Sequence, residues 1–82
     1  MTARNIDWLE RELAETRRVR AKALAMIEYL TPLHEAEPWA DVRHPDERGR
    51  SFEDWRMLEG NCARAIEDYE KRLRFARTDD ET

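Results

Sequence analysis

Residues 51–77 read SFEDWRMLEGNCARAIEDYEKRLRFAR, the longest stretch of the chain whose start, apolar spacing and end all predict the same element. Ser51 can cap a first helical turn, and Glu53 and Asp54 place negative charge where the helix dipole is positive. Positive side chains gather at the other end, where the dipole is negative: Lys71, Arg72, Arg74 and Arg77. The stretch therefore predicts an amphipathic helix over residues 51–77.

An apolar stripe runs along one face of this predicted helix, at steps of three and four residues. Its members are Phe52, Trp55, Leu58, Cys62, Ala65, Ile66, Tyr69, Leu73 and Ala76. Gly60-Asn61 is the weak point, because this pair can end one helix and cap another. The stripe keeps its phase across the pair, so we favour one continuous helix, in which the glycine costs about 1 kcal/mol relative to alanine.

A second helix is predicted over about residues 5–30. Its seam also follows three- and four-residue steps, through Ile6, Leu9, Leu13, Thr16, Arg20, Ala23, Ile27 and Leu30. The middle of this seam is polar. We expect the helix to stop at Thr31, because a residue before proline, here Pro32, is pushed out of the helical region of backbone space.

Residues 31–50 form a connector that holds all three prolines, both histidines and one of the two glycines. Loops of about 20 residues without structure are uncommon in compact domains. We therefore expect either a short helix opened by Thr31-Pro32 or a loop that contacts a partner. Residues 44–49 predict a turn, and the polar, acidic residues 78–82 predict a disordered tail.

Packing the two long helices against each other gives an all-α fold, an antiparallel helical hairpin. The pairing sets Leu30 against Phe52, Leu24 against Leu58, Leu13 against Tyr69 and Leu9 against Leu73. In the middle it brings Arg17 and Arg20 near a small or polar layer of Asn61, Cys62, Ala65 and Asp68.

This pairing leaves a second apolar stripe over, made by Trp8, Val19, Met26 and Tyr29 on the first helix and Met57 on the second. We expect such a face on a small protein to be covered, either by self-association into a four-helix bundle or by another protein.

The length and the charge balance exclude several classes of protein. A chain of 82 residues holds one domain at most, here a single helical domain over residues 1–82. The net charge of -4 argues against a generic DNA-coating role. Cys62 is the only cysteine and lies on the apolar stripe, where we expect a buried thiol without a disulfide. No stretch approaches the roughly 20 apolar residues of a membrane span, so we expect a cytoplasmic protein without a membrane partner.

Catalysis and metal binding find little support in the sequence. Acidic and histidine side chains crowd the connector at His34, Glu35, Glu37, Asp41, His44 and Asp46. Their spacing matches no established ligand pattern. No nucleophile stands at motif spacing from a base, and no glycine-rich loop is present to bind phosphate. We therefore expect a protein that is not an enzyme and has no metal or cofactor.

Nucleic-acid binding is the alternative function, because Arg17, Arg18, Arg20 and Lys22 form a basic run on the first helix. A second basic run, at the end of the other helix, would lie near the start of the first helix. The two basic runs would therefore not merge into one patch. The connector is too long for the turn of a helix-turn-helix motif.

Protein binding is the function that the sequence favours. Thirteen of the fifteen basic residues are arginine and there are three tryptophans, and both types are enriched at the centres of protein interfaces. The expected partner-binding residues are Trp8, Arg17, Arg18, Arg20, Trp39 and Arg43. In size and composition the chain is similar to many phage-encoded inhibitors and adaptors, anti-CRISPR proteins among them. The sequence thus predicts a module that occludes or bridges a protein partner, with a nucleic-acid binder and a structural homodimer as alternatives.

Overall fold

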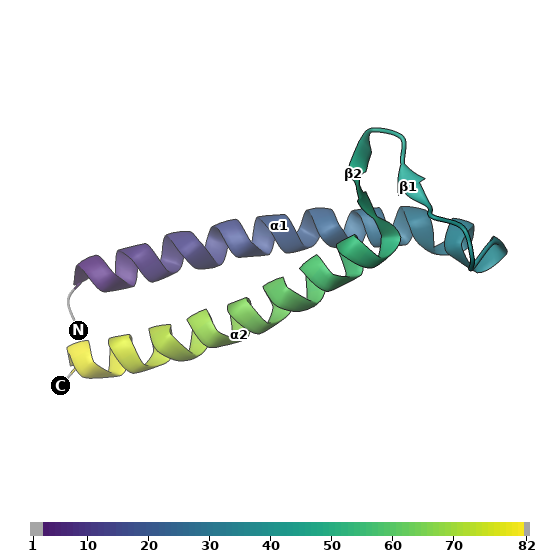
Figure 1. The fold of residues 1–82 in the computed structure, drawn as a ribbon. Coiled ribbons are helices and arrows are strands. Elements are labelled where there is room, and N and C mark those ends of the chain that lie inside the picture. Colours follow the sequence, from purple (N-terminus) through teal and green to yellow (C-terminus); the bar gives the residue numbers. More distant parts are fainter. Residues whose placement is uncertain (1–2, 82) are drawn as a thin grey trace.

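Two long antiparallel helices make up most of the molecule (Figure 1). The computed structural model describes residues 3–81. Helix α1 spans Ala3–Ala36 and helix α2 spans Phe52–Glu81, and between them lie the short strands β1, Arg43–His44, and β2, Glu47–Ser51. The molecule is a rod with extents of 56 × 19 × 14 Å. The predicted helical hairpin is confirmed, with a two-stranded sheet added to it.

Helix α1 continues six residues beyond the predicted stop, and that prediction was wrong. The hydroxyl of Thr31 donates to the carbonyl of Ile27 (2.6 Å), while Pro32 is exposed on the surface of the helix. One turn later, the ring of His34 stacks on the ring of Phe52, with 4.5 Å between the ring centroids. Packing of this last turn against the start of α2 outweighs the local preference of a residue before proline.

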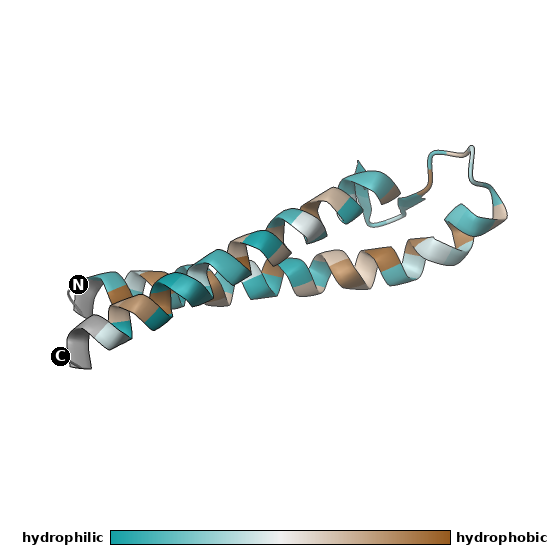
Figure 2. Cartoon of the chain, turned by 90° about the horizontal axis from the view of Figure 1, so that it is seen from below, coloured by the Kyte–Doolittle hydropathy of each residue, from teal (hydrophilic) through white to brown (hydrophobic). Residues whose placement is uncertain are grey.

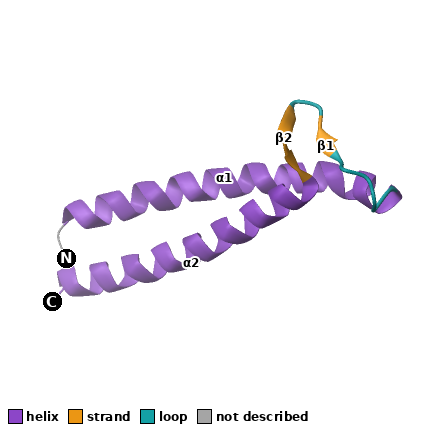
Figure 3. Ribbon diagram, viewed as in Figure 1, coloured by secondary structure: helices purple, strands orange, loops and turns teal. Residues whose placement is uncertain are grey.

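The first residues of the connector, 31–36, belong to α1, and a β-hairpin rather than a separate short helix follows them. Strands β1 and β2 are antiparallel, and His44 pairs with Glu47 across a turn formed by Pro45 and Asp46 (Figure 3). The turn predicted within residues 44–49 is therefore present. The Asp46 N–H donates to Nδ1 of His44 (3.0 Å).

The β-hairpin folds back onto α1. The ring of His44 lies 4.4 Å from that of Tyr29, and Lys22 forms an ion pair with Glu47. The hydrogen bond and the charge of Lys22 hold the pKa of the Glu47 carboxyl below its ordinary value. Because of these contacts the hairpin covers part of the apolar stripe that the sequence left unpaired.

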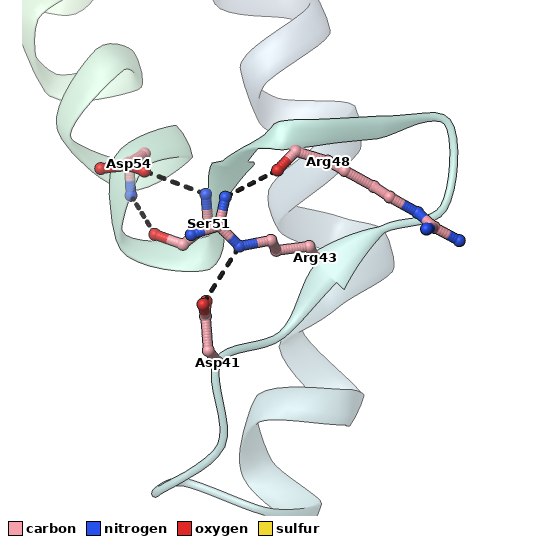
Figure 4. A network of polar contacts seen from close by, with 5 residues as sticks. All are labelled: Asp41, Arg43, Arg48, Ser51 and Asp54. Carbon is pink, nitrogen blue, oxygen red and sulfur yellow. Dashed lines mark hydrogen bonds and ion pairs between the residues drawn. The ribbon is translucent and has the colours of Figure 1, made fainter.

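Ser51 and Asp54 begin α2 with the predicted cap (Figure 4). The Ser51 N–H donates to the Asp54 carboxylate (3.0 Å), and the Asp54 N–H donates to the Ser51 hydroxyl (3.3 Å). The two bonds satisfy donors that the first turn of a helix leaves free.

Helix α2 is continuous through Gly60-Asn61, which confirms the reading that we favoured. It extends beyond the predicted end at Arg77. The hydroxyl of Thr78 donates to the carbonyl of Arg74 (2.8 Å), within regular helix. Residues 78–81 are helical rather than a disordered tail, and Thr82 lies outside the described residues.

The core between the helices is divided into two clusters of buried side chains. One contains Leu9, Leu13, Ile66 and Leu73, with Ile6 and Tyr69 packed against it; the other contains Ala23, Leu30, Phe52 and Trp55. Figure 2 shows apolar residues recurring along both helices between hydrophilic ones. In three of the four predicted pairs both residues lie in the same cluster: Leu9 with Leu73, Leu13 with Tyr69 and Leu30 with Phe52. The fourth was wrong, because Leu24 is 43% exposed.

A polar layer separates the two clusters. Arg20 reaches Glu59 at 3.4 Å, and the Nε atom of Arg20 is buried without a hydrogen-bond partner. Arg17 reaches Glu70 at 3.4 Å. The sequence predicted this polar middle, and the structure adds the ion-pair partners of the two arginines, Glu70 and Glu59. Cys62 is buried with a free thiol, as predicted.

Candidate protein-interaction site

Trp39 is the most exposed large apolar side chain in the described part of the chain, at 83%. It sits in the tight turn that follows α1. The turn is closed by hydrogen bonds from the N–H of Glu37 to the carbonyl of Leu33 (3.2 Å) and from the N–H of Ala40 to the carbonyl of Glu37 (3.0 Å). Pro38 lacks the N–H that would continue the helix. The chain therefore reverses here and presents the indole at the end of the rod.

A shallow hollow of about 300 Å³ lies beside Trp39. Stacked His34 and Phe52 contribute to its lining, together with the loop residues from Pro38 to Val42. The Phe52 N–H donates to the carbonyl of Val42 (3.2 Å), and the Val42 side chain packs against the Trp55 cluster. The hollow is thus built on the core, although Trp39 itself projects into solvent.

This end of the molecule is acidic. Residues 33–41 contain three carboxylates and no lysine or arginine, and Glu53 lines the same hollow. Asp41 forms an ion pair with Arg43 (3.1 Å), whereas Glu35, Glu37 and Glu53 form no ion pair within the described residues. The segment that carries the indole is therefore acidic, and the nearest cations to the hollow are Arg43, paired with Asp41, and Arg56, which lies over the Phe52 ring (5.7 Å to the ring centroid).

Arg43, one of the predicted partner-binding residues, makes contacts within the chain that hold the loop. Besides its bond to Asp41, it donates to the backbone carbonyl of Arg48 (2.6 Å), as Figure 4 shows. These contacts tie β1 both to the loop that carries Trp39 and to β2. Arg43 thereby positions the loop, and its guanidinium is already occupied.

The predicted basic run on α1 does not form one surface. Arg17 pairs with Glu70, Arg18 with Glu15 (3.4 Å), and Arg20 with Glu59. Successive residues of a helix project about 100° apart, so these three side chains point to different sides. Lys22, the last of the run, is paired with Glu47 of the β-hairpin. Every cation of the run thus has a carboxylate partner within the chain.

Trp8 lies near the opposite end of the rod from Trp39, so the two predicted tryptophans do not share a site. Its ring meets that of Tyr69 edge to face, with centroids 6.2 Å apart, and the side chain is 47% exposed. The contact covers half of the indole. Of the predicted residues, Trp39 alone combines high exposure with freedom from other contacts in the described structure.

Three other exposed apolar side chains were not proposed as contacts from the sequence: Leu24, Leu33 and Phe75. Leu24 and Phe75 each lie next to a buried residue, and a shift of one position rotates a side chain by about 100° away from the core. For Leu24 and Phe75, the helical spacing of the sequence is therefore enough to predict exposure. Leu33 could not be placed, because the continuation of α1 beyond Pro32 was not predicted.

The two histidines of the connector serve structural contacts in this fold, through the stacking of His34 on Phe52 and the hydrogen bond that His44 accepts in the turn. Among residues 3–81, no group of three or more histidine, cysteine, aspartate or glutamate side chains could hold a metal ion. Within the same residues, no helix is both long enough and apolar enough to cross a membrane.

Comparison with known proteins adds no relative. No family model matches the sequence, and no significant similarity to a curated protein or to a solved structure was found. The function is therefore argued from the chain's own surfaces.

Proposed function

We propose that this protein is a non-enzymatic helical-hairpin module that binds a partner protein through the end that carries Trp39. The exposure of Trp39, at 83%, is the observation that supports it. Tryptophan is the side chain most enriched among the residues that dominate the binding energy of interfaces. Binding at this end would occlude or bridge the partner's surface, as small phage-type inhibitors and adaptors do.

The position of Trp39 suits an anchor. The turn from Leu33 to Ala40 is fixed by two backbone hydrogen bonds, and Arg43 ties the following loop. A pre-formed turn loses little backbone entropy on binding, so the cost that remains is the ordering of the indole itself. The partner would therefore meet an apolar side chain whose backbone is already in place.

The charge around Trp39 favours a partner with a basic surface. Glu35, Glu37 and Glu53 are exposed and form no ion pair within the described residues. Opposite charges across an interface speed association and select against wrong partners, and their effect weakens with salt. Arginine side chains on the partner could also stack on the indole.

Substitution of Trp39 tests the proposal. The tagged protein is used to capture its partner from lysate of its native host, with nuclease treatment and washes at two salt concentrations. The affinity of the purified pair is then measured for wild type, Trp39→Ala and Phe75→Ala. We expect Trp39→Ala to weaken binding by about 2 kcal/mol, roughly thirtyfold. The control Phe75→Ala removes another aromatic side chain, 62% exposed, and should leave the affinity unchanged.

Two outcomes would contradict the proposal. One is equal affinity of Trp39→Ala and wild type, with both folded by circular dichroism, which would remove Trp39 from the site. The other is loss of all captured material on nuclease treatment, which would favour nucleic acid as the ligand.

A further inference from the structure

The last two turns of α1 have an apolar face that points away from the core. Its members stand at the i, i+3, i+4 and i+7 spacing of one helical face: Tyr29, Pro32, Leu33 and Ala36. All four are exposed, Tyr29 by 48% and Leu33 by 45%. Leu30, in the same turns, belongs to the buried Trp55 cluster. Here α1 therefore has a buried face toward α2 and an exposed apolar face, which we call the α1 stripe.

The β-hairpin leaves most of the α1 stripe open. It contacts α1 through the ring of His44, which lies against Tyr29, and through Glu47, which pairs with Lys22. Both contacts are at or before the first residue of the stripe. Leu33 lies one turn further toward the end of the rod. A continuous exposed apolar surface of this kind is typical of an interaction site.

The net charge of the chain is concentrated in the segment that contains the α1 stripe. Residues 23–42 include no lysine or arginine and four carboxylates: Glu28, Glu35, Glu37 and Asp41. The whole chain has nineteen aspartates and glutamates and fifteen lysines and arginines, so the remaining residues hold fifteen of each sign. The entire net charge of -4 thus belongs to this one segment.

Two of these carboxylates border one edge of the α1 stripe. Glu28 and Glu35 lie roughly 40° and 60° around the helix from Pro32. Both are exposed, and neither forms an ion pair within residues 3–81. The last cation of α1 before the stripe, Lys22, is already paired with Glu47. An apolar surface with uncompensated negative charge at its edge therefore faces solvent.

We infer that the α1 stripe binds a basic amphipathic helix of the partner protein. The inference rests on the proposed binding at the Trp39 end, since the stripe ends three residues before Trp39, and it names the kind of segment that binds there. An exposed helical face packs closely against a second helix, whose side chains fit between its own. Lysine or arginine side chains beside the apolar residues of that helix pair with Glu28 and Glu35. A nucleic acid is repelled by the same carboxylates.

Three synthetic peptides of about 18 residues, five helical turns, test the inference against the full chain. The first has leucine at the i, i+3, i+4 and i+7 spacing and lysine elsewhere. The second has glutamate in place of lysine, and the third has the composition of the first in an order without an apolar face. Binding is followed by NMR of the isotope-labelled protein. We expect saturable binding of the first peptide, with shifts at residues 28–39, no binding of the second, and at least about tenfold weaker binding of the third, for which only charge attraction remains.

Two variants weaken the surface without disturbing the core, because both side chains are exposed: Leu33→Gln and Glu35→Lys. Each should reduce the affinity for the lysine peptide about tenfold. Phe75→Gln is the control for the first, since it removes another apolar side chain, 62% exposed. Glu67→Lys is the control for the second, since it makes the same change of charge at an exposed carboxylate of α2. Both controls should bind like wild type.

Either of two results would overturn the inference. One is a lysine peptide that shows no saturation at about 1 mM. The other is an equal loss of affinity in Glu35→Lys and Glu67→Lys, because the peptide would then respond to the overall charge and not to the edge of the α1 stripe.

The inference and the proposed function can fail separately, because Leu33→Gln and Glu35→Lys keep Trp39. If the captured natural partner loses affinity for Trp39→Ala alone, the proposed function stands and the inference fails. If it loses affinity for the two stripe variants and not for Trp39→Ala, the α1 stripe is the binding site and Trp39 is not its anchor.

Discussion

Asp54 shows how a single residue sets a helix boundary and makes its stability depend on pH. Hydrogen bonds to Ser51 hold the pKa of the Asp54 carboxyl below its ordinary value of 3.8, and the bond to the Ser51 backbone has the larger effect. A carboxyl whose pKa is lowered by folding stabilises the folded state above its unfolded pKa, and this stabilisation is lost as the pH falls through the folded pKa. The cap is therefore expected to weaken only in acid.

We predict that Asp54→Asn reduces the acid sensitivity of the fold. In wild type, the unfolding free energy should fall as the pH drops through about 4 and below, since Asp54 and Glu47 both have lowered pKa values. The asparagine variant should show a shallower fall over that range. Urea denaturation at about pH 7 and about pH 3 measures the difference.

The matched control is Glu67→Gln, which changes an exposed carboxylate of α2 that forms no ion pair within the described residues. If the unfolding free energy falls equally in acid for Asp54→Asn and wild type, the lowered pKa of Asp54 does not affect stability.

At the scale of the elements, the start of α2 and the pairing of the two helices were predictable from the sequence, whereas the end of α1 and the β-hairpin were not. The start of α2 was predictable because Ser51 and Asp54 lie three residues apart. The end of α1 was not, because His34 stabilises it by stacking on Phe52, eighteen residues away. The β-hairpin escaped detection because its short strands are polar and gain their support from α1.

The candidate site was also predictable only in part. Trp39 lies outside both apolar seams, so the sequence predicted that it or Trp8 is partly exposed, and its exposure confirms that part of the prediction. The part played by Arg43 depends on a carbonyl five residues away across the hairpin, which no spacing rule indicates. Leu24 was assigned to the core because it lies beside the seam, but it is exposed.

The continuation of α1 through Pro32 leads to a second prediction, that Pro32→Ala stabilises the protein. Proline lacks an N–H for the carbonyl of residue 28 and its ring crowds that carbonyl, which costs about 3 kcal/mol inside a helix. Its rigidity in the unfolded chain offsets about 1 kcal/mol of this cost. We expect the unfolding free energy in urea to rise by about 1–2 kcal/mol.

Pro45→Ala is the control, since Pro45 lies in the turn of the β-hairpin and should gain nothing from the change. The prediction is wrong if Pro32→Ala leaves the unfolding free energy unchanged or lowers it while helicity is preserved. Pro32 would then not destabilise α1 in the way that we propose.

For the whole molecule, the division of the core determines where the rod opens first. The Trp55 cluster lies beside the connection between the helices, is flanked by the β-hairpin and contains Trp55 and Leu30, both below 2% exposed. The Leu9 cluster lies toward the unconnected ends of the helices. Between the two clusters lie the ion pair of Arg20 with Glu59, the buried Nε of Arg20, which lacks a hydrogen-bond partner, and only the small buried side chain of Cys62. The two ends should therefore open with different free energies.

We predict that backbone amides around Leu9 and Leu73 exchange with solvent at least about tenfold faster than those around Leu30 and Trp55, as measured by native-state hydrogen exchange with NMR. Opening the first group breaks contacts at the free end only, whereas opening the second requires the whole hairpin to separate. Arg20→Leu should reduce the difference, because leucine joins the two clusters and removes the unsatisfied Nε. Arg18→Leu, an exposed position with only a weak pair to Glu15, is the control and should leave the difference unchanged. Equal protection at both ends in wild type would mean that the polar layer does not divide the core, and that the rod unfolds as one cooperative unit.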